Sequence, residues 1–269
     1  MTNHIFDSAL SKYIAQAGYC SRRQATELIK SGKVTVNGKI VTTPFTIVEK
    51  NDVVYVEKNQ IIAAKKIYIL FNKPKNLVCS VSDEKNRKTV SDIFTPFFSE
   101  RLYPIGRLDR STTGLLIMTN DGQLTQRLSH PKYEVAKLYQ VSSELAITKA
   151  TLDTLINGVP LEDGFMKVDQ AYYPTSSKKV VCVVIHSGKN HIVRRLFAEL
   201  GYPDIKLDRS EYAGLTKKGL RTGEWRNLTE QEIKTLYQDD KHTTLETEQK
   251  EKEVKKIKKD RNKKYYARL

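Results

Sequence analysis

One short loop carries the residues best suited to acid–base or nucleophilic chemistry. It runs from Gly106 to Gly114 and places Asp109 between two cations, Arg107 and Arg110. Nearby cations favour the charged form of a carboxyl group, so we expect Asp109 to be ionised. An isolated aspartate in a loop is more often an ordinary turn residue that hydrogen-bonds its own backbone. The loop is therefore a candidate site that the rest of the chain has to support.

Patterns that mark other catalytic or cofactor sites are missing from the sequence. It contains no GxGxxG, HExxH or GxSxG, and Gly188-Lys189 lacks the earlier glycine of a phosphate-binding loop. The three cysteines have no CxxC spacing, and the five histidines show no ligand spacing. We therefore expect no cofactor and no metal. Lone cysteines also favour a reduced, cytoplasmic compartment over a disulfide framework.

The composition favours a folded protein with a polyanionic partner. The 269 residues include 46 Lys and Arg against 31 Asp and Glu, a formal net charge of +15, and 39% are hydrophobic. That apolar content can form a core, which excludes wholesale disorder. No apolar run reaches the ~18 to 20 residues of a membrane span, so we expect no membrane partner. Strong positive charge instead points to nucleic acid.

The elements around the loop predict a mixed sheet. Short β-branched runs predict strands over residues 67–71, 115–119, 139–141 and 180–186. An apolar stripe predicts a helix over residues 190–200, and a capping box at Thr229 predicts a last helix that ends near Gln238. Because strands and helices do not strictly alternate, we predict an α+β fold with a largely antiparallel sheet and flanking helices.

A smaller domain is predicted ahead of this sheet. Apolar spacing indicates a helix that closes at Gly18, and Ser21 with Gln24 forms a capping box for a second helix. Asn37-Gly38 between two apolar runs is typical of a β-hairpin. We therefore divide the chain into a small αβ domain (1–60), a linker (61–66), a catalytic domain (67–238) and a basic tail (239–269). Residues 254–269 of the tail hold eight basic side chains and one acidic.

The small domain carries a group of cations that we assign to RNA binding. Two of them, Arg22 and Arg23, fall in the first turn of a helix, where positive charge is unfavourable unless an anion lies outside. The motifs in this region resemble the S4-type RNA-binding module: Ser11-Lys12-Tyr13-Ile14, Gly18-Tyr19-Cys20-Ser21-Arg22-Arg23 and Gly32-Lys33-Val34-Thr35-Val36-Asn37-Gly38. The full set of candidate RNA-binding residues in this domain is Lys12, Arg22, Arg23, Lys30, Lys33 and Lys39.

The candidate loop itself belongs to a longer resemblance. It is similar to the catalytic motif of the RsuA/RluB/RluE/RluF family of rRNA pseudouridine synthases. The matching motifs follow one another in the order of that family: Gly106-Arg107-Leu108-Asp109, Thr113-Gly114-Leu115-Leu116, Thr119-Asn120-Asp121-Gly122, Lys137-Leu138-Tyr139-Gln140-Val141 and Ser187-Gly188-Lys189-Asn190-His191-Ile192-Val193-Arg194-Arg195. Together with the S4-like start, the resemblance covers about residues 10–238.

The resemblance implies roles for three catalytic residues. It makes Asp109 the essential carboxylate, acting either as a nucleophile or as a base, Tyr139 the aromatic face for a flipped uracil, and Arg194 the partner of Asp109. A tyrosine that only fills the core is the alternative for Tyr139. We further assign Arg107, Arg110, Lys137, Lys189 and Arg195 to RNA binding, although Lys189 replaces an arginine common at that place in the family.

The implied reaction is an isomerisation in ribosomal RNA. The N-glycosidic bond breaks, uracil rotates while held, and a carbon–carbon bond forms to the same sugar. We favour 23S rRNA, free or in an assembly particle, as the partner of a monomeric enzyme. Two alternatives stay open, a 16S rRNA pseudouridine synthase and a non-catalytic RNA-binding assembly factor.

Overall fold

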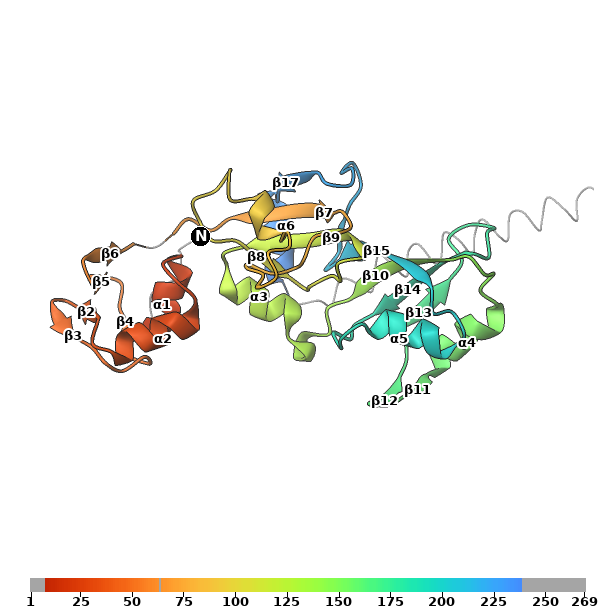
Figure 1. Cartoon of the computed structure of the whole chain (residues 1–269), viewed down its shortest axis with the longest axis horizontal. Helices are drawn as coiled ribbons and strands as arrows, with labels where there is room; N and C mark the ends of the chain where they lie inside the picture. The colour runs from red at the N-terminus through yellow and green to blue at the C-terminus, as the bar shows by residue number, and fades with distance from the viewer. Residues whose placement is uncertain (1–7, 63, 239–269) are drawn as a thin grey trace, which may run out of the picture.

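A computed structural model describes residues 8–62 and 64–238 of the chain (Figure 1). The predicted basic tail, 239–269, lies outside the described residues. Within the described part, no helix is long and apolar enough to cross a membrane. A small domain and a larger sheet domain follow one another along the chain, as predicted.

The small domain packs two helices against a four-stranded sheet. Helix α2 (Arg22–Lys30) begins with the predicted capping box, in which Ser21 and Gln24 bond each other's backbone N–H groups. The hairpin is also confirmed, because Asn37 and Gly38 both have positive φ, as a tight two-residue turn requires. The other elements are β1 (Ser8–Ala9), α1 (Leu10–Gln16), β2 (Val34–Val36), β3 (Lys39–Ile40), β4 (Ile47–Val48), β5 (Val54–Val56) and β6 (Asn59–Ile61).

The end of the small domain differs from the predicted boundary at residue 60. Strand β6 pairs with β5, so the sheet order is β3-β2-β5-β6. Ile61 is buried in the small-domain core with residues such as Leu10 and Val54. The domain therefore extends through Ile61. The three-residue strand escaped prediction because its sequence, Asn-Gln-Ile, has a single apolar side chain.

The larger domain is built on a nine-stranded mixed sheet. Its main path is β13-β14-β10-β15-β9-β7-β17, with β16 added to β15 and β8 added to β9. Strands β15 and β9 are parallel, and the other pairs are antiparallel. The sheet strands are β7 (Tyr68–Lys73), β8 (Tyr103–Ile105), β9 (Thr113–Thr119), β10 (Lys137–Ser143), β13 (Gln170–Tyr172), β14 (Val180–Ile185), β15 (Ile205–Tyr212), β16 (Leu215–Thr216) and β17 (Trp225–Asn227).

Helices and short elements surround this sheet. A separate hairpin pairs β11 with β12. The predicted capping box at Thr229 and Glu232 opens the last helix. The bounds of these elements are η1 (Ser91–Ile93), α3 (Gly122–Ser129), η2 (Pro131–Tyr133), α4 (Lys149–Asn157), β11 (Val159–Leu161), β12 (Gly164–Met166), α5 (Ile192–Glu199) and α6 (Glu230–Tyr237).

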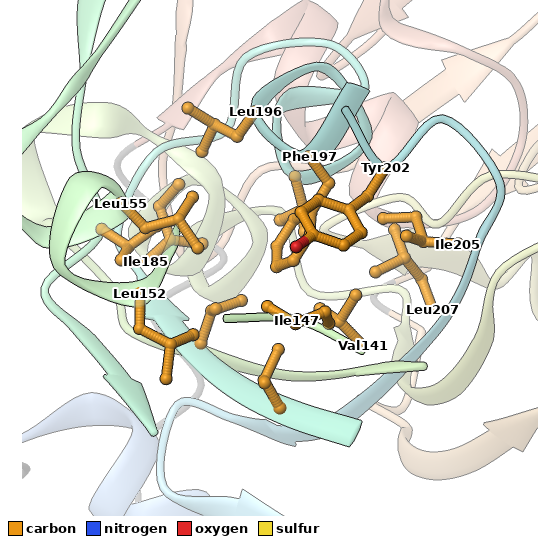
Figure 2. Packing of buried hydrophobic residues seen from close by; sticks show 14 of the residues in the cluster. Val141, Ile147, Leu152, Leu155, Ile185, Leu196, Phe197, Tyr202, Ile205 and Leu207 are labelled. Atoms are coloured by element: carbon orange, nitrogen blue, oxygen red, sulfur yellow. The ribbon is translucent and has the colours of Figure 1, made fainter. Parts of the chain in front are cut away.

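The core of the large domain explains why the strands hold their places. Along β9, Leu115 and Ile117 join one buried cluster while Leu116 and Met118 join another, so both faces of this strand are covered. A third cluster packs α4 and α5 against β10 and β14 (Figure 2). Continuous apolar runs such as 115–118 are typical of strands buried on both faces. The loop that precedes β9 is thereby attached to a strand that is covered on both faces.

Candidate active site

The candidate loop is fixed at both ends by glycines that cannot be replaced without a clash. Gly106 has φ +63°, and a Cβ there would lie 2.7 Å from the Tyr212 hydroxyl oxygen. Gly114 has φ +109°, and its Cβ would lie 2.3 Å from the carbonyl oxygen of Arg209. Both conformations and both close approaches require glycine. The loop is therefore pressed against β15 at its two ends.

Two buried cations hold the backbone of the loop. The Lys73 ammonium donates to the carbonyl oxygens of Asp109 (3.2 Å) and Thr112 (2.9 Å). The Arg209 guanidinium donates to the carbonyls of Gly106 (2.6 Å) and Leu115 (2.8 Å). Both side chains are fully buried, and burial lowers the pKa of Lys73. Sequence reasoning missed both residues.

The two carboxylate oxygens of Asp109 contact different residues. Oδ2 accepts a hydrogen bond from Nε of Arg194 at 3.2 Å and lies 3.4 Å from the Thr112 hydroxyl. Oδ1 lies 3.3 Å from Nε2 of His191. The Asp109 side chain is 27% exposed, so it is sheltered but still reachable. The predicted proximity of Asp109 and Arg194 is present in the structure.

Arg194 is itself locked in place by three further acceptors. Its Nη1 donates to the carbonyl of Ile205 at 2.9 Å, and its Nη2 donates to the hydroxyls of Ser111 and Thr112. Helix α5 supplies this side chain, and Ile192, Val193, Leu196 and Phe197 bury the apolar stripe of the helix. Because one guanidinium joins α5, β15 and the candidate loop, the position of Asp109 depends on the packing of all three.

Asp109 lines a cleft of about 700 Å³, together with the predicted Tyr139 and Lys137. The backbone register between β10 and β15 shifts between Leu138 and Tyr139, a β-bulge of the kind that re-aims side chains near functional sites. Tyr139 also contacts two of the core clusters while it lines the cleft. The structure thus brings Asp109 and Tyr139 to one cavity.

Lys137 lies in the wall of this cleft, but its charge faces the protein. Its ammonium donates to the carbonyls of Val135 (2.9 Å) and His186 (3.0 Å). Burial, and to a smaller extent the Arg209 charge, lowers the pKa of Lys137 to about 8. This differs from the expectation that Lys137 presents its charge to RNA, because the side chain is buried and its ammonium is bonded to two backbone carbonyls.

The other cations predicted to bind RNA fall into exposed and paired groups. Arg107 and Arg110 are exposed and line the cleft. Arg22 and Arg23 are exposed on α2 of the small domain. In contrast, Lys189 and Arg195 both pair with Asp163, between β11 and β12, whose pKa they lower to about 2. Of the remaining small-domain cations, Lys12 is half-buried, Lys30 and Lys39 are exposed, and Lys33 pairs with Glu57 at 2.9 Å.

Three histidines line the same cleft, which sequence reasoning did not anticipate: His130, His186 and His191. Nδ1 of His186 lies 2.8 Å from Asp169, whose hydrogen bond raises the pKa of the imidazole. Among the described residues there is no group of three or more His, Cys, Asp or Glu side chains that could hold a metal. The chemistry of the cleft is therefore that of one carboxylate among cations, imidazoles and a tyrosine ring.

Comparison with known proteins identifies the family of this chain. The model of the S4 domain matches residues 10–54, and the model described as RNA pseudouridylate synthase matches residues 67–199. A Bacillus subtilis protein named ribosomal large subunit pseudouridine synthase B is 42% identical over 231 residues, which cover 84% of this chain and 94% of that protein. The chain belongs to the RNA pseudouridine synthase family.

Other members of the RNA pseudouridine synthase family are similar over the same span. An Aquifex aeolicus protein, named as an uncharacterized RNA pseudouridine synthase, is 34% identical over 232 residues, which cover 85% of this chain and 93% of that protein. A crystal structure of a pseudouridylate synthase matches with a TM-score of 0.61 and 30% identity, over 85% of this chain and 99% of that one. Both predicted domains are thus part of the family resemblance.

Proposed function

We propose that this enzyme converts a uridine of large-subunit ribosomal RNA to pseudouridine, with Asp109 as the reacting carboxylate. The observation that carries the proposal is the position of Asp109. Its carboxylate is anchored through Oδ2 to Arg194 and lines a cleft of about 700 Å³. Pockets of this size accept small ligands, and one nucleotide falls within that range.

The surroundings of Asp109 suit a flipped nucleotide. A base inside an RNA helix cannot reach a carboxylate, so it has to leave its stack and be held on an aromatic surface. Tyr139 offers such a surface in the same cleft, and exposed Arg107 and Arg110 at the cleft suit the flanking phosphates. This arrangement supports a catalytic role over that of an RNA-binding assembly factor.

The ribosomal target is supported by the relatives and by the small domain. The Bacillus subtilis relative is named for the large ribosomal subunit. The S4-like domain exposes Arg22 and Arg23 in the first turn of α2, and this first turn contains no acidic residue. Cations there are unfavourable to the helix dipole, and an RNA phosphate outside would reverse the sign of that interaction.

Mapping of pseudouridines in 23S and 16S rRNA, with and without the gene, tests the proposal. We expect a 23S position to lose its pseudouridine without the gene and to regain it when the gene is restored. Loss of a 16S position instead would place the target in the small subunit. Unchanged maps of both RNAs would contradict the proposed function.

A further inference from the structure

The conformation of His191 is unusual for the place where it stands. It occupies the N-cap of α5 with φ 50° and ψ 26°, in the left-handed region, and its side chain makes no capping hydrogen bond. A non-glycine residue in this region costs of order 1 kcal/mol or more, and such residues cluster at functional sites. The N-cap position itself therefore gives no reason for a histidine.

His191 contacts Oδ1 of Asp109, the carboxylate oxygen that does not bond to Arg194. Arg194 Nε and the Thr112 hydroxyl both lie against Oδ2, whereas Nε2 of His191 lies 3.3 Å from Oδ1. His191 and Asp109 both line the cleft. In the cleft, Oδ1 of Asp109 is therefore covered by the imidazole, and Oδ2 is already hydrogen-bonded to Arg194. A substrate that reacts with Oδ1 has to displace the imidazole.

The two contacts differ in how easily they can be broken. Arg194 is 23% exposed and makes four hydrogen bonds, so it is fixed. The His191 side chain is 54% exposed. Within the described part of the chain, Asp109 is the one side chain that its imidazole contacts as a polar partner. An imidazole at this position can move aside without unfolding α5, because the helix is anchored by its buried stripe.

We propose that His191 is a positioning residue that covers Oδ1 of Asp109 in the free enzyme and moves away when uridine enters. The inference rests on the proposed function of Asp109. It implies that access of the substrate to Oδ1 depends on the protonation of His191. A protonated imidazole binds a carboxylate as an ion pair and a neutral one only as a hydrogen bond. Protonation therefore strengthens the cover and competes with substrate.

The other charged groups around His191 predict an effect of opposite sign. At a cleft that binds RNA, any further protonation adds positive charge and strengthens phosphate binding. A loss of kcat/KM on acidification is therefore opposite in sign to this effect on phosphate binding, and comparison with a His191 variant assigns the loss to the contact with Asp109. The charged and titratable groups that line the cleft with His191 or lie on α5 are Cys79, Arg107, Asp109, Arg110, His130, Lys137, Tyr139, His186, Lys189, Arg194, Arg195, Glu199, Arg209 and Tyr212.

The test is the pH dependence of kcat/KM for pseudouridine formation by the full chain on an rRNA transcript. Because a protonated imidazole holds Asp109 more strongly than a neutral one, we expect kcat/KM of the natural enzyme to fall about tenfold from pH 8 to pH 5.5. His191→Asn keeps a residue that tolerates the left-handed region but carries no charge. The variant should lose most of the decline, so that its kcat/KM values at pH 8 and pH 5.5 lie within about threefold of each other.

A matched control separates His191 from its neighbours. His186→Asn removes another cleft histidine, one that pairs with Asp169 rather than Asp109, and it should keep the acid decline. Equal thermal unfolding of the two variants shows that both fold. A natural enzyme without the decline, or a His191→Asn variant that retains it, overturns the inference. Activity in Asp109→Asn would instead overturn the proposed function, so the two failures are distinct.

Discussion

Arg194 on α5 and Asp109 on the candidate loop are joined by a hydrogen bond of 3.2 Å from Nε to Oδ2, across 85 residues of sequence. The guanidinium uses its other nitrogens on Ile205, Ser111 and Thr112. One side chain thus sets the position of the carboxylate relative to the sheet. A planar group with several donors in fixed directions is required for this, and a lysine ammonium does not supply it.

Replacement of Arg194 by lysine is therefore expected to lower kcat strongly while the protein still folds. We expect a loss of about a hundredfold, equal to about 2.7 kcal/mol of transition-state free energy, measured by single-turnover pseudouridine formation. Arg195→Lys is the matched control, because Arg195 pairs with Asp163 rather than Asp109. Activity of Arg194→Lys equal to that of the control would show that this pairing does not position the reacting group.

Tyr139 is expected to act through its ring rather than its hydroxyl. Stacking of a base on an aromatic side chain contributes about 1 to 3 kcal/mol. Tyr139→Leu should therefore lower kcat/KM by roughly 5- to 150-fold, while Tyr139→Phe stays near the natural value.

Thermal unfolding of both variants provides the check on this interpretation. Tyr139 also contacts two core clusters, so a tyrosine with a purely structural role would reduce stability and activity together. If Tyr139→Phe lost as much activity as Tyr139→Leu, the hydroxyl rather than the ring would be needed.

Glu232 provides a prediction about stability and pH. Its carboxylate accepts two hydrogen bonds from Arg226, of 2.7 and 2.8 Å, which lower its pKa to about 2. This pKa lies below the value of about 4.3 in an unfolded chain. The ion pair therefore stabilises the fold fully above about pH 4.3, and this stabilisation is lost as the pH falls through about 2. The pair is partly exposed, so we expect a contribution of about 1 kcal/mol.

Glu232→Gln should accordingly unfold at a lower temperature than the natural protein at pH 7, and the difference should shrink as the pH approaches 2. Thermal unfolding at a series of pH values measures it. Glu230→Gln, two residues earlier in the same helix and without an ion pair among the described residues, serves as the control. A difference that stayed constant with pH would assign the effect to the hydrogen bond that the Glu232 side chain accepts from the Thr229 backbone N–H.

Local signals in the sequence predicted the parts of the fold that depend on neighbouring residues. Two capping boxes and the Asn37-Gly38 turn formed as expected, since each is decided within about four residues. The short strands β8, β16 and β17 were not predicted, because two or three residues are too few to show a periodic pattern. Their places are decided by the strands beside them.

The candidate site was predicted in part for a related reason. The family motifs identified Asp109 and Arg194, but no local pattern indicates that Lys73 bonds the loop from 36 residues away, or that Arg209 does so from 94 and 103. Asp163 likewise pairs with Lys189 and Arg195 from a separate hairpin. Contacts of this kind follow from the strand order, which the residues alone did not fix.

The central claim is that Asp109 carries out the reaction, and Asp109→Asn tests it most directly. The amide preserves size and leaves Lys73 bonded to the backbone carbonyl, so folding and RNA affinity should be retained. Pseudouridine formed in a single turnover on an rRNA transcript, with RNA binding measured in parallel, is the required measurement. We predict unchanged binding and a rate lowered by roughly a thousandfold or more. A variant that binds RNA and forms pseudouridine at the natural rate would contradict the account.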